Sequence, residues 1–375
     1  MNELQSSSGS AKLGSDSSWW KSDISLGFLA KRPGPKDLAV MSRQMAAMIG
    51  AGLPILKTIK VLSEQTENKI LSSALDAVKM DVEGGESLSG ALGKHPQIFP
   101  SLMLGLVRAG EAGGFLDQSL ENIASTLEKE ADLRATVKSA LTYPVAVLLM
   151  AFLAVIAMLI WVVPVFDQMF KSLGGQLPLP TQILVWLSPV VLWTSPVFVV
   201  AATVFLVWWR KNKQRDSLRR FKDTLVAKLP VIGQLTKKIV IARFTRNLAS
   251  LLNGGVPILH SLAIMSVTTQ NWAMDQSLIS IQNSVKSGST LSAPMSADKV
   301  FPPMVTQMIT IGEDSGTLGA MLGKVADFYD SEVKATTEQL TALIEPIMIA
   351  FIGVVIGAMI VALYLPIFTI FNEIR

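Results

Sequence analysis

Two glutamates stand out as candidate chemical groups because each lies between glycines in a short motif that occurs twice. Glu111 belongs to Gly110-Glu-Ala-Gly-Gly114, and Glu313 belongs to Gly312-Glu-Asp-Ser-Gly316. A carboxylate beside a glycine turn that precedes a helix can accept hydrogen bonds from free backbone N–H groups and interact with the helix dipole. We therefore expect a structural role for both acids, at the start of the following helix. Contact with a partner and metal binding are the alternatives.

Other groups suited to catalysis are missing from the sequence. The chain has no cysteine, which excludes disulfides, thiolate catalysis and thiolate metal sites. His95 and His260 do not occupy matching positions in the repeat described below, so we expect neither to be a metal ligand or a base. The Walker A loop, the dinucleotide-binding glycine pattern, the His-Glu-x-x-His motif and the Gly-x-Ser-x-Gly elbow are also absent. The sequence therefore predicts no catalytic residue, no cofactor site and no metal site.

The elements that must position these residues include membrane-spanning segments. Half of the 375 residues are apolar, and the mean hydropathy is +0.44. Residues 144–166, 183–209 and 347–371 form uncharged windows, each long enough to cross about 30 Å of hydrocarbon as a helix. A buried core helix is the alternative, but such a helix seldom stays apolar on every face over this length. We therefore expect three transmembrane helices, and no cleaved signal peptide at the polar N-terminus.

Basic residues after the second window set the predicted orientation. The segment from Arg210 to Lys222 contains seven Lys and Arg residues and one acid. In residues 167–182, by contrast, the only charged residues are Asp167 and Lys171. By the positive-inside rule, the basic end is cytoplasmic and the connection is external. This places the N-terminus in the cytoplasm and the C-terminus outside. The basic segment could instead bind nucleic acid, but its position at a membrane exit explains it without a nucleic-acid partner, and weak contact with anionic lipid is compatible with it.

An internal repeat with a spacing of about 200 residues determines the predicted architecture. The loop sequence from Ala51 to Ile59 recurs from Gly254 to Leu262, and the sequence from Val82 to Ser89 recurs from Val285 to Ser292. Each copy leads into an apolar window, so the middle window returns the chain to the cytoplasm. The repeated positions that we expect to have structural or partner-contact roles are Arg43, Gly52, Pro54, Gly110, Glu111, Gly114, Tyr143 and Pro144 in the first copy, and Arg246, Gly255, Pro257, Gly312, Glu313, Gly316, Glu345 and Pro346 in the second.

Apolar residues recur at steps of three and four within each copy, as at Leu116, Leu120, Ile123 and Leu127, which is typical of helices. The sequence thus predicts an all-α membrane protein with two repeated cytoplasmic antiparallel helical-bundle domains and three transmembrane helices. The predicted segments are a disordered N-terminus (1–35), cytoplasmic domain 1 (36–143), transmembrane helix 1 (144–166), an external loop (167–182), transmembrane helix 2 (183–209), a basic cytoplasmic linker (210–238), cytoplasmic domain 2 (239–345) and transmembrane helix 3 (346–371).

These features together resemble the inner-membrane platform proteins of type IV pilus assembly and type II secretion. The resemblance rests on the paired domains, the Gly-x-Pro loops, the Gly-Glu turns, the Tyr-Pro and Glu-Pro pairs, and the closing Tyr364-Leu-Pro-Ile-Phe368. It implies a non-enzymatic scaffold that forms homo-oligomers in the bacterial inner membrane. It also implies three sets of partners: a cytoplasmic hexameric assembly ATPase, pilins or pseudopilins, and other inner-membrane assembly proteins.

Two rival functions are less consistent with the sequence. A transporter would normally place ionisable residues within its spans, and the three windows contain none. A membrane-bound enzyme would need one of the missing catalytic motifs. Between the two systems that the resemblance names, the pilus platform is the first hypothesis and the secretion platform is the alternative.

Overall fold

The structure is a computed structural model that describes residues 32–172, 178–212, 216–230, 232–269 and 271–373. Within these ranges all regular elements are helices, which confirms the predicted all-α class. The prediction of a disordered N-terminus falls almost entirely on residues outside the described part of the chain. Its last residues are described, and Pro35 begins the first helix.

The first half of the chain folds into six helices whose ends follow local capping rules. The side chain of Asn68 accepts hydrogen bonds from the N–H groups of Ile70 and Leu71, and so caps α3. Gly114 has φ +75°, a left-handed conformation that ends α5. The six helices, which we call the first half, are α1 (Pro35–Gly50), α2 (Ile55–Gln65), α3 (Lys69–Glu83), α4 (Leu88–Gly93), α5 (Ser101–Gly113) and α6 (Leu116–Ala157).

The helices of residues 232–373 follow the same order. The second, third and fourth helices have 11, 15 and 6 residues in both halves. Several of the breaks between helices contain glycine or proline, as at Gly255, Pro257 and Pro302. The helices of this second half are α10 (Ile232–Asn253), α11 (Ile258–Thr268), α12 (Trp272–Lys286), α13 (Ser292–Ala297), α14 (Pro303–Asp314) and α15 (Leu318–Glu373).

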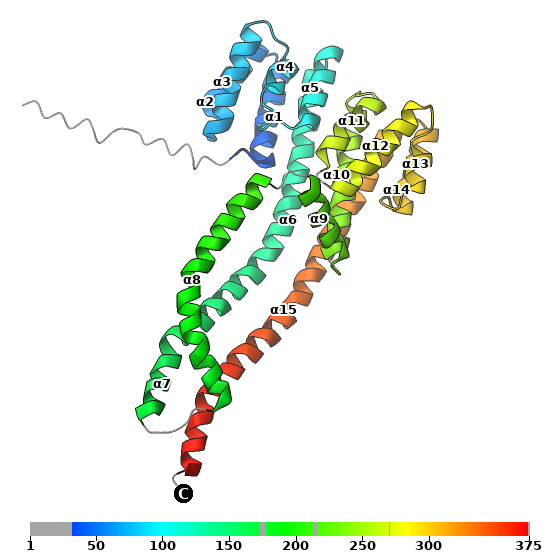
Figure 1. Cartoon of the computed structure of the whole chain (residues 1–375). Helices are drawn as coiled ribbons and strands as arrows, with labels where there is room; N and C mark the ends of the chain where they lie inside the picture. Colours follow the sequence, from blue (N-terminus) through cyan, green and yellow to red (C-terminus); the bar gives the residue numbers. More distant parts are fainter. Residues whose placement is uncertain (1–31, 173–177, 213–215, 231, 270, 374–375) are drawn as a thin grey trace, which may run out of the picture.

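The two helical bundles lie side by side at one end of the molecule, with α5, α6, α10 and α11 between them (Figure 1). Apolar side chains at helical spacing face inward, so α1 packs on α6 and α10 packs on α15. The buried residues of both bundles form one continuous hydrophobic cluster, in which Met45, Phe99 and Phe244 are fully buried. The bundles are therefore held together by a shared core.

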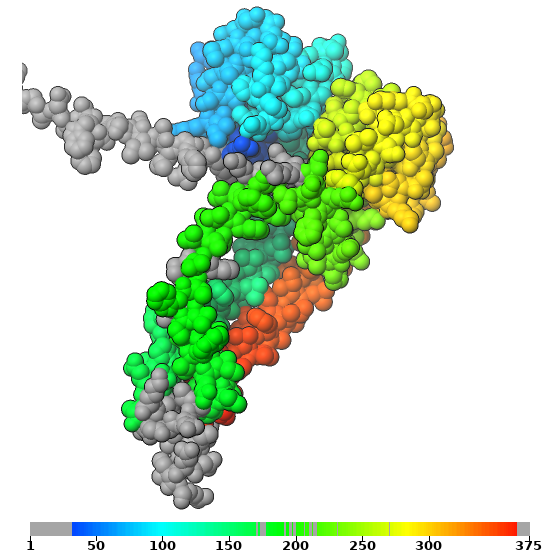
Figure 2. All heavy atoms as spheres, in the orientation of Figure 1, coloured from blue at the N-terminus to red at the C-terminus, as the bar shows by residue number. Residues whose placement is uncertain are grey.

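Three long helical segments extend away from the bundles (Figures 1 and 2). The first is α6 with its continuation, a π-helical turn η2 (Met158–Val162) and α7 (Val163–Ser172). The second is α8 (Leu179–Asn212), and the third is α15. In the described part of the chain, two helical stretches are long and apolar enough to span a membrane, Leu116–Met169 and Leu318–Leu365.

The extended segments expose apolar side chains, as a membrane-embedded surface requires. Trp161, Trp193 and Val354 are among the most exposed large apolar residues of the protein. The segments also contact one another. The hydroxyl group of Ser188 on α8 donates a 2.7 Å hydrogen bond to the backbone oxygen of Leu159. A buried polar group bonded in this way avoids the cost of an unpaired donor in hydrocarbon.

Helices cross the boundaries that the sequence analysis drew between domains and spans. Pro144, expected at the start of a span, lies inside α6, and α15 continues through Pro346. The basic linker contains α9 (Asp216–Lys228), which docks on α12. Arg219 forms a 2.6 Å ion pair with Asp275 in this contact.

Candidate functional site

Each Gly-Glu motif forms a bidentate cap on a short helix. The two carboxylate oxygens of Glu111 accept hydrogen bonds from the N–H groups of Leu88 (2.5 Å) and Ser89 (3.0 Å) at the start of α4. The carboxylate of Glu313 accepts the equivalent bonds from Leu291 (2.7 Å) and Ser292 (3.0 Å) at the start of α13. Both acids therefore satisfy backbone donors that a helix start leaves unpaired.

The helices that Glu111 and Glu313 cap differ from those expected from the sequence, and they explain why a second motif is repeated. The two carboxylates cap helices that precede them in the chain, and not the following helices α6 and α15 as expected, because each acid lies in the last turns of α5 or α14 and faces the adjoining short helix. The sequence around Ser89 and the sequence around Ser292 are themselves a repeated motif. The capping bonds join this motif to the Gly-Glu motif in both halves, so one constraint accounts for both.

The neighbouring glycines serve close packing and positive φ angles. A Cβ atom added to Gly110 would lie 2.5 Å from the Oγ atom of Ser119, and one added to Gly312 would lie 2.8 Å from the Cα atom of Leu318. These distances leave no room for a side chain. The other repeated glycines have a left-handed conformation with φ between +69° and +84°, which a side chain disfavours; they are Gly52, Gly114, Gly255 and Gly316.

The remaining repeated residues occupy separate places. Pro54 and Pro257 stand immediately before α2 and α11, where a missing N–H group costs nothing. Tyr143, Glu345 and Pro346 are exposed on the long helices, whereas Pro144 is buried. The structure does not bring these four residues into contact with the Gly-Glu turns.

The paired arginines each contact an acid on the long helix of their own half. The Nη2 atom of Arg43 lies 2.6 Å from Glu128, and Arg43 also pairs with Glu121. Arg246 pairs with Asp330. The sequence analysis missed these acids, although Glu128 and Asp330 are separated by the same spacing as Glu111 and Glu313. That spacing was the available signal.

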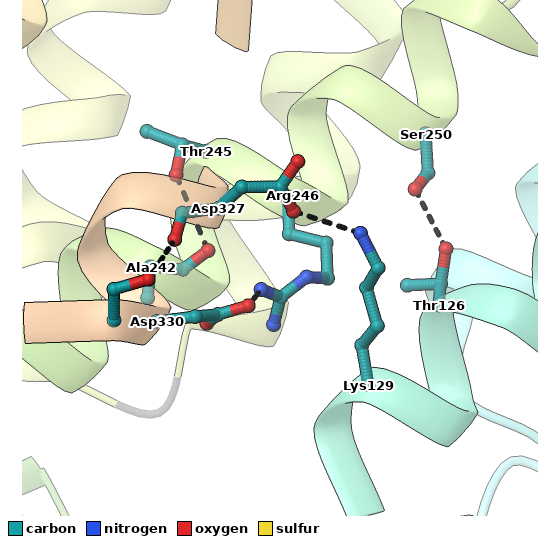
Figure 3. Close-up of polar contacts among 9 residues, drawn as sticks. Thr126, Lys129, Ala242, Thr245, Arg246, Ser250, Asp327 and Asp330 are labelled. Carbon is teal, nitrogen blue, oxygen red and sulfur yellow. Dashed lines mark hydrogen bonds and ion pairs between the residues drawn. The ribbon is translucent and has the colours of Figure 1, made fainter. Parts of the chain in front are cut away.

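The two arginines differ in their surroundings because the first half covers only one of them. The side chain of Arg43 is 39% exposed, whereas that of Arg246 is 6% exposed. Figure 3 shows Lys129 and Thr126 of α6 approaching the surface around Arg246. Lys129 forms a 2.8 Å ion pair with Asp327, and the hydroxyl oxygens of Thr126 and Ser250 lie 2.7 Å apart.

Burial shapes the electrostatics of this polar cluster. It lowers the pKa of Arg246 from its usual value, and the charges of Asp327 and Glu130 partly offset the decrease. Burial likewise lowers the pKa of Arg243, which lies 4.0 Å from Glu130. Several polar atoms of Arg243, Arg246 and Asp330 have no protein partner. Of the ion pairs in this cluster, Lys129 with Asp327 and Arg243 with Glu130 join the two halves.

A small cavity lies where the two halves meet. This cavity of about 30 Å³, lined by Glu130, Asn247 and Thr268, is large enough for a water molecule but too small for an organic substrate. Among the described residues, no group of three or more His, Asp or Glu side chains is arranged to hold a metal ion. The repeated residues of this region serve packing, helix capping and ion pairing.

Comparison with known proteins places the chain in a family. The profile of the family described as "Type II secretion system (T2SS), protein F" matches residues 41–164 and 244–366. The chain is 39% identical to the type IV pilus assembly protein PilC of Myxococcus xanthus, covering 91% of this chain and 82% of the relative. It is 41% identical to PilC of Thermus thermophilus, covering 94% and 87%. It is 33% identical to type II secretion system protein F of Pseudomonas aeruginosa, covering 89% and 83%. The chain therefore belongs to the type II secretion system protein F family.

Proposed function

We propose that this chain is the membrane platform of a type IV pilus assembly machine. The observation that carries the proposal is its similarity, over about nine-tenths of its length, to proteins named for pilus assembly. Identity to two of these relatives is 39% and 41%, compared with 33% and 32% for two relatives named type II secretion system protein F. Platform function in type II secretion is the alternative.

The platform would connect events in the cytoplasm to the membrane. Its bundles would meet a cytoplasmic hexameric assembly ATPase and other inner-membrane assembly proteins, and its spans would meet pilins. The continuity of α15 from its bundle into its apolar segment supports this role, because a continuous helix transmits a displacement along its length. Under this proposal the protein hydrolyses no nucleotide, uses no cofactor and binds no nucleic acid directly.

Deletion of the gene should abolish surface pili while leaving the secretion of folded enzymes unchanged. A chromosomal copy of the wild-type gene should restore pili to the deletion strain. Electron microscopy and the recovery of sheared pili measure the first effect, and enzyme activity in the culture medium measures the second. Normal pili with lost secretion would favour the alternative, and no change in either would contradict both.

The proposed topology has three spans, with both bundles in the cytoplasm and the C-terminus outside. It is supported by the basic residues after α8 and by the family profile, which matches once in each half. The two halves would then share one fold, each leading into a span. Alkaline phosphatase, which is active only outside the cytoplasm, should be active when fused after Arg375 and inactive when fused at Gly233. A reversed pattern at either position would contradict the topology.

A further inference from the structure

The interface between the two halves uses different surfaces on each side. The first half contributes its joining face, formed by α5 and α6, and the second half contributes its receiving face, formed by α10, α11 and the side of α15 that carries Asp327. The fit is close: a Cβ atom added to Gly105 would lie 2.5 Å from the Cδ1 atom of Ile264, and one added to Gly254 would lie 2.5 Å from the Cδ2 atom of Leu106. An interface of this kind leaves one unused face at each end of the pair.

The unused receiving face lies on α1 and α2 of the first half. Each residue of this face is matched to the residue of the second half that lies as far from it in the sequence as Arg246 lies from Arg43. At several of these matched positions the residue of the second half is buried, whereas the residue of the first half is more exposed. Val40, at the position of Arg243, is a large apolar residue that is 48% exposed. The pairs that differ in this way are Arg43 and Arg246, Gln44 and Asn247, Met48 and Leu251, Ala51 and Gly254, and Val61 and Ile264.

The unused joining face lies on α14 and α15 of the second half. Matching positions here follow the spacing between Glu111 and Glu313. Phe328 stands at the position of the buried Thr126 and is 47% exposed, and Ile311 stands at the position of the half-buried Ala109 and is 54% exposed. Large apolar residues therefore lie on the surface at the positions where the first half makes its interface.

We propose that the joining face of one copy docks on the receiving face of a second copy, and so repeats the packing between the two halves. The proposal rests on the platform function, which requires an assembly in the membrane. Repeated units that stack through complementary faces normally end in polar surfaces when the array is complete. Here the two unused faces instead carry exposed apolar residues, Val40 on one and Phe328 and Ile311 on the other.

The contact is heterologous, because it joins two different surfaces. Contacts of this kind produce closed rings or open rows. The spans of both halves extend in the same direction from the bundles, so a second copy added in the same way would place its spans alongside those of the first (Figure 1). The membrane would then confine the assembly to a ring or a row in its plane.

Cysteine cross-linking in native membranes tests this contact, since the wild-type chain contains no cysteine. Thr126→Cys with Ser250→Cys provides the reference, because these hydroxyl oxygens lie 2.7 Å apart within one chain. The equivalent positions across the proposed contact are Phe328 and Ala47. When F328C and A47C chains with different tags are produced together, mild oxidation should give a disulfide-linked dimer that contains both tags.

Two further variants make the outcome decisive. Met80 is 65% exposed on α3, away from both faces, so M80C should give no dimer with F328C. Adding Ile311→Glu to the F328C chain should lower the yield of the F328C–A47C dimer by about tenfold, as expected for losing one anchoring contact.

Three results would overturn the proposal: absence of the F328C–A47C dimer while the reference disulfide forms, efficient dimers of A47C or F328C with itself, or an equal yield with M80C. The cross-link is measured without reference to pili. Failure of this contact can therefore be distinguished from failure of the platform function, which the gene deletion measures.

Discussion

Asp330→Asn should reduce the free energy of unfolding of the bundles by about 3 kcal/mol, because it leaves the charge of Arg246 buried without its partner. The side chain of Arg246 is 6% exposed, and hydration cannot replace the lost ion pair. We expect the low end of the range for broken buried pairs because Asp327 and Glu130 also favour the charged arginine. Chemical denaturation of the detergent-solubilised protein, followed by circular dichroism, measures the change.

The first half provides a matched control for this variant. Glu128→Gln removes the equivalent acid, but Arg43 is 39% exposed and retains Glu121. The loss should therefore stay below about 1 kcal/mol, as for other exposed pairs. Equal effects of the two substitutions would mean that burial by the first half does not determine the strength of the ion pair.

Gly312→Ala should destabilise the second half by about 1–3 kcal/mol, although alanine favours helices more than glycine does. The added methyl group would lie 2.8 Å from the Cα atom of Leu318 and 3.2 Å from the Cβ atom of Met321. The nearest atom belongs to the backbone at the start of α15 and cannot move aside as a flexible side chain could. The close approach of α14 to α15 would have to widen, and the cap of Glu313 on α13 would be disturbed with it.

Gly323→Ala supplies the comparison, since it makes the same change on α15 where the added methyl group meets no atom within 4 Å. This variant should be more stable than the wild type, by up to about 1 kcal/mol. The two variants should thus change the melting temperature in opposite directions. A decrease of similar size in both would show that the close approach at Gly312 does not matter.

Local signals in the sequence were sufficient to predict the all-helical class, but not where the long helices end. The helical class follows from apolar residues at steps of three and four, and the structure agrees with it. The role of Glu111 was predicted only in part. Its neighbours in the sequence suggested a cap, but the donors at Leu88 and Ser89 lie 23 and 22 positions away. A pattern based on neighbouring residues cannot identify such a partner.

Two other features could not be predicted from residue type and spacing. Arg43 and Arg246 look equivalent in the sequence, and only the packing of α6 on α10 and α15 makes one of them buried. The domain boundary at Tyr143-Pro144 was drawn where charge gives way to apolar residues. The helix passes through this point because the residues on both sides favour helix, and a change of solvent does not require a change of backbone.

The unbroken course of α15 has a mechanical consequence. Its 56 residues correspond to a rod about 84 Å long at 1.5 Å per residue, and a tilt of about 10° at the bundle would move its far end by about 15 Å. Both arms contain an internal proline, Pro144 in α6 and Pro346 in α15, but the arm that begins with α6 also contains the π-helical turn η2, which interrupts its regular hydrogen bonding. We therefore expect α15 to be stiffer than the arm that begins with α6. An equal torque on the two bundles would then displace the far ends of the two arms by different distances.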